Sequence, residues 1–181
     1  MSGNRVKTDA LNTVYTSEVY PLGTTFEEHP DEVATNNSGA GAAGSTYSLL
    51  QGSRTWVFIQ CVAPVNAGDL VKRNAVTTPF VGAQDNTNEG TKWLMLGVAD
   101  HAIAAPNYGW IIKKGPCVVQ AEAGVAAGDL LASDGNTTVG EVDTWTGGAG
   151  LSHKIVGIAL EAEDASSAGG AGFVQAIIDI P

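Results

Sequence analysis

The chain has 181 residues, of which 44% are hydrophobic and only 15% are charged, with 23 glycines and a formal net charge of −10. This length suits one domain with a sizeable core, and abundant Gly, Thr and Val with sparse Lys and Glu favour strands and turns over helices. The acidic balance, with Lys and Arg scattered along the chain, argues against nucleic acid and anionic membrane surfaces as partners.

The N-terminal residues carry no apolar segment of the kind that a secretory signal needs, and no apolar run approaches membrane-spanning length. We therefore expect synthesis in a cytoplasm and residence there, or in a particle assembled there. Cys61 and Cys117 each lie within an apolar run, a position that predicts buried free thiols in a reducing compartment.

Residues 1–54 differ in character from the rest of the chain. Tyr15, Tyr20 and Phe26 are scattered among polar residues without a sustained period, and residues 36–45 form a low-complexity stretch rich in Gly, Ala and Asn. Such a stretch loses much backbone entropy if it becomes ordered. The sequence predicts an extended N-terminal arm with a Gly/Ala-rich linker, and the three aromatic residues are candidate partner contacts that become ordered on binding.

From residue 55 onward, short β-branched and aromatic runs separated by Gly-rich turns are typical of an all-β domain, and no convincing amphipathic helix is present. Residues 56–62 read as a core strand, residues 113–116 as a hairpin turn, and residues 173–180 as the best alternating strand. The remaining predicted strands cover residues 69–73, 92–99, 109–113, 116–121, 129–133, 137–142 and 154–161. The prediction is a small antiparallel β-barrel or β-sandwich, tulip-like or jelly-roll-like, over residues 55–181, with little helix.

An internal repeat runs through this domain. Residues 65–71 (VNAGDLV) return as residues 125–131 (VAAGDLL), and residues 96–99 (LGVA) return as residues 156–159 (VGIA), both at an offset of 60. Two motifs that keep one register over this interval predict a duplicated structural unit.

The repeated residues have a simple physical interpretation. Gly68 can adopt a positive φ that closes a turn, and the side chain of Asp69 can accept backbone N–H groups where the next strand begins. Gly97 and Gly157 lie inside strand patterns, where Gly usually marks a bulge or a close approach of two backbones. The repeat therefore predicts scaffolding.

Candidate reaction chemistry is sparse in this sequence. His29, His101 and His153 lie far apart, without metal-ligand spacing, and Asp100-His101 has no Gly-x-Ser-x-Gly nucleophile elbow, so we interpret His101 as a surface residue that follows a strand. We predict no enzymatic activity and no catalytic, cofactor-binding or metal-binding residues.

The four tryptophans divide into two groups. Trp56, Trp93 and Trp110 lie in predicted strands and are expected in the core. Trp145 lies beside a Gly-rich loop and is a further candidate partner contact.

The AGDLV turn at residues 67–71, the LGVA strand at residues 96–99 and the closing GAGFVQA at residues 170–176 resemble the capsid decoration (cement) proteins of tailed bacteriophages. The resemblance covers roughly residues 55–181. It implies a compact β-domain on the outer surface of the capsid and assembly as a homotrimer. It also implies contact with the major capsid protein and no catalytic residues.

From this resemblance we expect a structural virion protein that stabilises contacts between major capsid subunits. The alternatives are another phage structural component, such as a head–tail adaptor, tail or fibre protein, and a carbohydrate-binding module or hydrolase on a β-sandwich. A cleft with paired carboxylates or aligned aromatic residues would mark the last of these.

Overall fold

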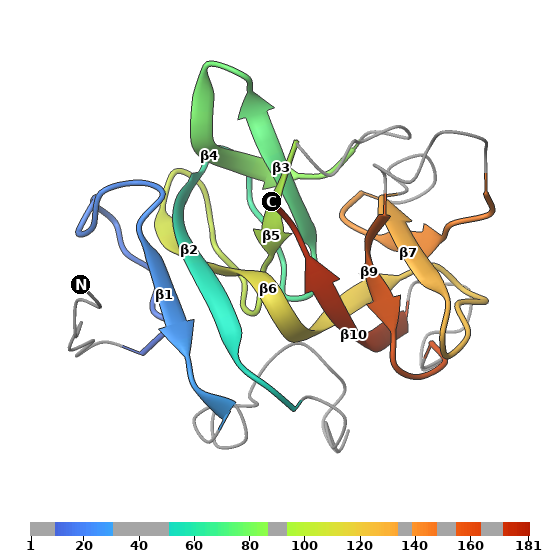
Figure 1. The fold of residues 1–181 in the computed structure, drawn as a ribbon. Coiled ribbons are helices and arrows are strands. Elements are labelled where there is room, and N and C mark those ends of the chain that lie inside the picture. Colours follow the sequence, from blue (N-terminus) through green and yellow to red (C-terminus); the bar gives the residue numbers. More distant parts are fainter. Residues whose placement is uncertain (1–9, 31–50, 87–93, 134–138, 148–154, 164–171) are drawn as a thin grey trace.

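The computed structural model describes residues 10–30, 51–86, 94–133, 139–147, 155–163 and 172–181. These residues form an all-β protein, as predicted, with ten strands in one mixed sheet of order β1-β2-β4-β3-β5-β6-β10-β9-β7-β8 (Figure 1). In the described ranges no helix has the length and apolar character needed to cross a membrane.

The strands in the first part of the chain are β1 (Thr25–Glu28), β2 (Arg54–Cys61), β3 (Leu70–Ala75), β4 (Thr78–Gln84) and β5 (Met95–Val98). The strands in the second part are β6 (Tyr108–Ala121), β7 (Leu130–Ser133), β8 (Val142–Thr144), β9 (Ile155–Ala159) and β10 (Gly172–Asp179). Most predicted strands are present with small differences at their ends. In β10 the predicted inward face is confirmed, because Val174, Ala176, Ile178 and Ile180 are buried.

The hairpin predicted at residues 113–116 is wrong, because β6 runs without interruption from Tyr108 to Ala121. Gly115 adopts φ +101 and lies so close to the backbone of Ser53 that a Cβ would not fit. Its conformation lets one strand change direction while it pairs first with β2 and then with β10. The sequence signal for a turn was therefore a signal for a bend within a strand.

Two strands were not predicted. β4 contains Pro79 and Gly82, which usually weaken a strand, yet its backbone pairs with β3 and with the end of β2. β1 lies inside the range predicted as an arm and pairs antiparallel with β2, in a register that places Phe26 opposite Trp56. The strand predicted at residues 137–142 is instead β8, three residues long, and residues 134–138 lie outside the described residues.

The pairings close into two circuits that share β6. In the first, β2 pairs with β4, β4 with β3, β3 with β5, β5 with β6, and β6 returns to β2. In the second, β6 pairs with β8, β8 with β7, β7 with β9, β9 with β10, and β10 returns to β6. Figure 1 shows β6 crossing from the group around β2 and β3 to the group around β7, β9 and β10.

We call these circuits the first copy (β2 to β5 with residues 108–113 of β6) and the second copy (residues 114–121 of β6 with β7 to β10). Their registers match at the offset of 60. The pair Val71↔Gly97 corresponds to Leu131↔Gly157, and a bulge follows at the same place in each copy. The parallel pair Cys61↔Gly82 corresponds to Ala121↔Val142. The predicted duplication is thus visible in the backbone pairing itself.

The core repeats as well. A buried cluster in the first copy draws on β2, β3, β5 and β6, and the residue 60 positions later is buried in the second copy at seven of its positions. The seven pairs are Val57 and Cys117, Ile59 and Val119, Cys61 and Ala121, Val65 and Val125, Val71 and Leu131, Leu96 and Val156, and Ala99 and Ala159. Both cysteines are therefore buried free thiols, as predicted.

The repeated turns behave as predicted. Gly68 and Gly128 adopt φ +88 and +90. The carboxylate of Asp69 accepts the N–H of Asn66 at 2.5 Å, and that of Asp129 accepts the N–H of Ala126 at 2.9 Å. These side chains hold their own turns, which is a scaffolding role.

Candidate functional site

Residues 10–28, which we call the N-terminal strap, run along the outer face of the first copy. The N–H and C=O of Tyr15 exchange two hydrogen bonds of 2.9 Å with Tyr108 at the start of β6. Further along, the backbone of Phe58 exchanges two bonds of 2.9 Å with Gly23 and Thr24. The strap is therefore joined to the sheet by backbone bonds before β1 begins.

Aromatic packing reinforces these bonds. The ring centroid of Tyr20 lies 5.3 Å from that of Phe58 and 5.3 Å from that of Trp110, in edge-on and tilted arrangements. The ring of Tyr15 lies 5.8 Å from Phe58. Phe58 and Trp110 point outward from the first copy, so the strap shields two large apolar side chains from water.

The predicted contact residues Tyr15, Tyr20 and Phe26 are thus partly buried on the chain's own core. The sequence suggested ordering against a neighbouring subunit, whereas this part of the arm is already ordered on its own domain. A contact between these three side chains and a partner stays a prediction. The boundary between arm and domain at residue 54 stays a prediction, and β1, which lies within the predicted arm, belongs to the sheet.

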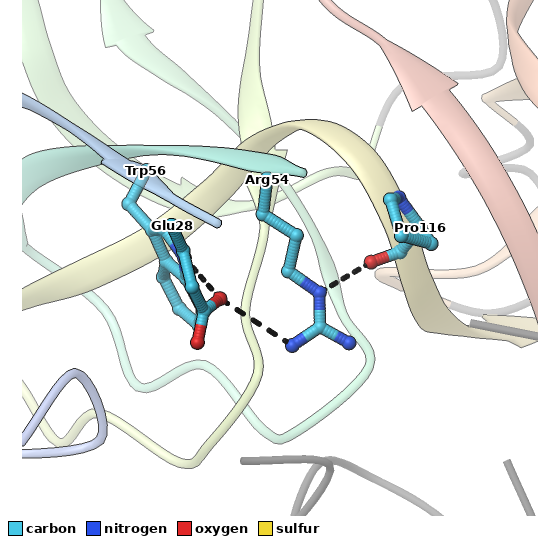
Figure 2. Close-up of polar contacts among 4 residues, drawn as sticks. All are labelled: Glu28, Arg54, Trp56 and Pro116. Carbon is cyan, nitrogen blue, oxygen red and sulfur yellow. Dashed lines mark hydrogen bonds and ion pairs between the residues drawn. The ribbon is translucent and has the colours of Figure 1, made fainter. Parts of the chain in front are cut away.

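A buried ion pair anchors the C-terminal end of the strap (Figure 2). The Nη1 of Arg54 lies 3.7 Å from the Oε2 of Glu28, and these side chains are 2% and 1% exposed. The same Oε2 accepts the indole N–H of Trp56 at 2.9 Å, while the Nε of Arg54 donates to the carbonyl of Pro116 at 2.6 Å. One arginine on β2 therefore joins β1 to the middle of β6.

A second buried carboxyl group, that of Asp100, lies within range of the charges of this ion pair. Burial raises the pKa of Asp100 to about 6, an effect that the charge of Arg54 opposes and that of Glu28 reinforces. The carboxyl group of Asp100 therefore senses both charges of the ion pair, and it loses its own charge as the pH falls through about 6. Nothing in the local sequence marks this association, because Glu28 and Arg54 are separated by the low-complexity stretch.

The opposite side of the strap faces solvent. Val14 and Val19 are exposed, while the next residue in each case, Tyr15 or Tyr20, turns toward the core. Glu18 and Glu27 are also exposed. The strap therefore presents apolar and acidic side chains outward from a backbone that is held in place from beneath.

Trp145 occupies a different part of the molecule. It follows β8, at the other end of the strand order from β1, and its backbone N–H donates to the carbonyl of Leu130 at 2.7 Å. Its side chain is partly exposed, whereas Trp56 and Trp110 are buried as predicted. Trp93 lies outside the described residues.

His101 is not the surface residue that the sequence suggested. It is partly buried, with its Nε2 close to Gly109, and burial lowers its pKa to about 4. Neither of its ring nitrogens has a hydrogen-bond partner in the part of the chain that the structure describes. Among those same residues, no group of three or more His, Cys, Asp or Glu has the arrangement of a metal site.

Neither a family model nor a curated protein matches the chain. Among solved structures, the base of the head fibre gp8.5 of bacteriophage phi29 is similar, with a TM-score of 0.47 and 12% sequence identity. The matched region covers 68% of this chain and 92% of the fibre base. Similarity of this degree carries no argument about function.

Proposed function

We propose that the chain is a structural protein of a tailed-phage virion that binds the outer surface of the capsid and braces neighbouring major capsid subunits. The observation that carries the proposal is the construction of the N-terminal strap. Its aromatic side is fixed on the first copy, and its other side offers Val14 and Val19 to solvent. The resemblance of the repeated turns and strands to capsid decoration proteins is in keeping with this role.

The strap suits a contact with a protein surface because it is already ordered. Backbone bonds through Tyr15 and Phe58, and the buried pair of Glu28 and Arg54, fix its course before a partner arrives. A partner then gains the burial of the exposed valines without an ordering cost for this segment.

Bracing requires only that one rigid body touch two subunits. A protein bound across a subunit boundary opposes separation of the subunits by the free energy of the contact that separation would break. Two copies joined through a single β6 provide such a body. Placement at a symmetry axis of the capsid, as a homotrimer, is part of the proposal.

The test is co-sedimentation of the purified chain with shells assembled from its cognate major capsid protein. We expect the unaltered chain to sediment with the shells, and the double variant Val14→Glu with Val19→Glu to lose most of that binding. The double variant Val76→Glu with Val139→Glu is the matched control, since it adds the same charge at exposed valines away from the strap. It should bind as the unaltered chain does.

Two outcomes would count against the proposal. If the unaltered chain does not sediment with shells, a head–tail adaptor, tail or fibre role replaces capsid bracing. If the chain binds and the strap variant binds equally well, the strap is not the contact. Circular dichroism of each variant establishes that it is folded.

A further inference from the structure

Three apolar side chains lie side by side on the outer face of the second copy. Leu130 on β7 is paired with Ile158 on β9, and Ile158 is paired with Ile177 on β10. Directly paired residues project from the same side of a sheet, so these three form one row. The exposed fractions of these side chains are 40% for Leu130, 38% for Ile158 and 43% for Ile177. Trp145 is joined by its backbone to Leu130 and extends the row toward β8.

The first copy has the same row, but there it is covered. Leu70 is paired with Val98, and Val98 with Ile112, and all three are 0% exposed. The backbone bond from Trp145 to Leu130 also has a counterpart, since the N–H of Asp85 donates to the carbonyl of Leu70. Two equivalent rows of similar side chains therefore have opposite exposure.

The cover over the first row is the second copy. The N–H of Leu70 donates to the carbonyl of Gly140 at 2.7 Å, and the N–H of Ile180 donates to the carbonyl of Lys113 at 3.2 Å. Ile178 and Ile180 belong to the same buried cluster as the first row. This face of the unit is thus already used, within one chain, to bind another copy of the unit.

We propose that the row of Leu130, Ile158 and Ile177, with Trp145 beside it, is a self-association surface on which a second copy of this chain docks with its own row. The equivalent face in the first copy is covered by a copy of the unit, whereas among the described residues no further copy of the unit covers the second row. At a net charge of −10, identical chains repel one another, and the burial of these apolar side chains is the favourable contribution that can offset the repulsion. Rows that meet around an axis give a closed assembly.

This inference does not depend on capsid binding. The contact is made by the second copy, whereas the strap lies on the first copy, so self-association and binding to the capsid can each fail without the other; the homotrimer of the proposed function is the one part that rests on both. Self-association is measured on the purified chain alone, in the absence of shells.

The first test is solution mass by sedimentation equilibrium over a range of concentrations. We expect the unaltered chain to form an oligomer, and Ile158→Glu to raise its dissociation constant by at least about tenfold, because a charge at the centre of an apolar contact is desolvated on association. Val62→Glu is the matched control. Val62 is similarly exposed on the first copy, and the equivalent position in the second copy is already Glu122. The oligomer of the Val62→Glu variant should have the same dissociation constant as that of the unaltered chain.

A second test reports the geometry of the contact. Ile158→Cys should form covalent dimers with a short bismaleimide, whereas Val62→Cys should not. Cys61 and Cys117 do not interfere, because both are buried and burial raises the pKa of each thiol to about 12.

The proposal is overturned if the unaltered chain is monomeric up to its solubility limit, which would assign the row to a different protein. It is also overturned if Ile158→Glu leaves the dissociation constant unchanged while remaining folded. Equal cross-linking through Ile158→Cys and Val62→Cys would contradict the row-to-row arrangement.

Discussion

The two copies have the same backbone arrangement, but their outer faces are covered differently. Turns, bulge and strand register repeat at one offset, yet the outer face of the first copy carries Phe58 and Trp110 under the strap, and that of the second copy carries Leu130, Ile158 and Ile177 in contact with water. The features that the two copies have in common are therefore those of backbone hydrogen bonding and close backbone approach. The side chains on the outer face differ between the copies because the two outer faces have different surroundings.

The largest expected difference between the copies concerns Arg54 and its counterpart 60 residues later, Lys114. Arg54→Met leaves Glu28 charged and buried, so we expect a loss of about 3–5 kcal/mol in the free energy of unfolding. Lys114 pairs with Asp179 at 2.7 Å, but both side chains are largely exposed, so Lys114→Met should cost less than about 1 kcal/mol. Urea unfolding of the two variants measures both values.

Equal losses for these two variants would show that the anchor of the strap contributes no more than a surface ion pair. Glu28→Gln with Arg54→Met is the informative double variant. It should recover part of the stability that Arg54→Met loses, because no charge is then left unpaired by the substitution.

The next effect tests the similarity of the copies. A Cβ on Gly97 would collide with the carbonyl oxygen of Ile112, and a Cβ on Gly157 with that of Ile177, both within the sheet backbone. Gly97→Ala and Gly157→Ala should therefore each cost about 2–3 kcal/mol, since strand backbones cannot move apart without losing bonds. Thermal unfolding followed by circular dichroism compares them. If only one of the two variants loses stability, the two glycines do not have equivalent roles in the two copies.

A smaller contrast lies in the repeated turns. Ala at either position must adopt a positive φ, which costs about 1–2 kcal/mol. At Gly68 the new Cβ would also lie 2.8 Å from the ring of Phe173, whereas at Gly128 nothing lies within 4 Å. Gly68→Ala should therefore be more destabilising than Gly128→Ala by about 1 kcal/mol. Identical losses in urea would mean that the Phe173 ring gives way without cost.

The smallest effect is one of pH. Burial raises the pKa of Asp69 above its ordinary value of 3.8, whereas hydrogen bonds from Ala126 and Thr144 lower the pKa of Asp129 below it. Asp69 is therefore destabilising when ionised, and this cost disappears as the pH falls through its raised pKa. Asp129 stabilises above pH 3.8, and this contribution is lost as the pH falls through its lowered pKa.

Carboxyl chemical shifts followed by NMR should therefore give a higher midpoint for Asp69 than for Asp129. Asp69→Asn and Asp129→Asn should shift the pH dependence of stability in opposite directions around pH 4. The same direction for both would show that the two turns share one environment.

The repeat was the most informative feature of the sequence, because the residues that it preserves are those that a backbone turn or a close approach requires. Gly68, Asp69 and Gly97 could be assigned structural roles from type and spacing alone. The bend at Gly115 could not, since a Gly-Pro pair indicates a turn unless one knows that strands on either side continue to pair with it. β4 was missed because Pro79 and Gly82 obscure its pattern.

The contact surfaces were harder to predict for a different reason. Whether Tyr20 faces a partner or the chain's own core depends on Phe58 and Trp110, which are distant in sequence. The row at Ile158 reads much like the row at Val98. Only the packing of one copy on the other decides which of them is covered, and this information is absent from a local pattern.

The continuous strand β6 has a consequence for how the protein comes apart. Each circuit needs part of β6 to close, so neither can lose its place on that strand without weakening the other. We therefore expect a single cooperative unfolding transition despite the duplicated architecture, with coincident fluorescence and circular dichroism curves. Division of the chain at Gly115 would not yield two small stable domains. We therefore expect the two copies, although they repeat one pattern, to unfold as one unit.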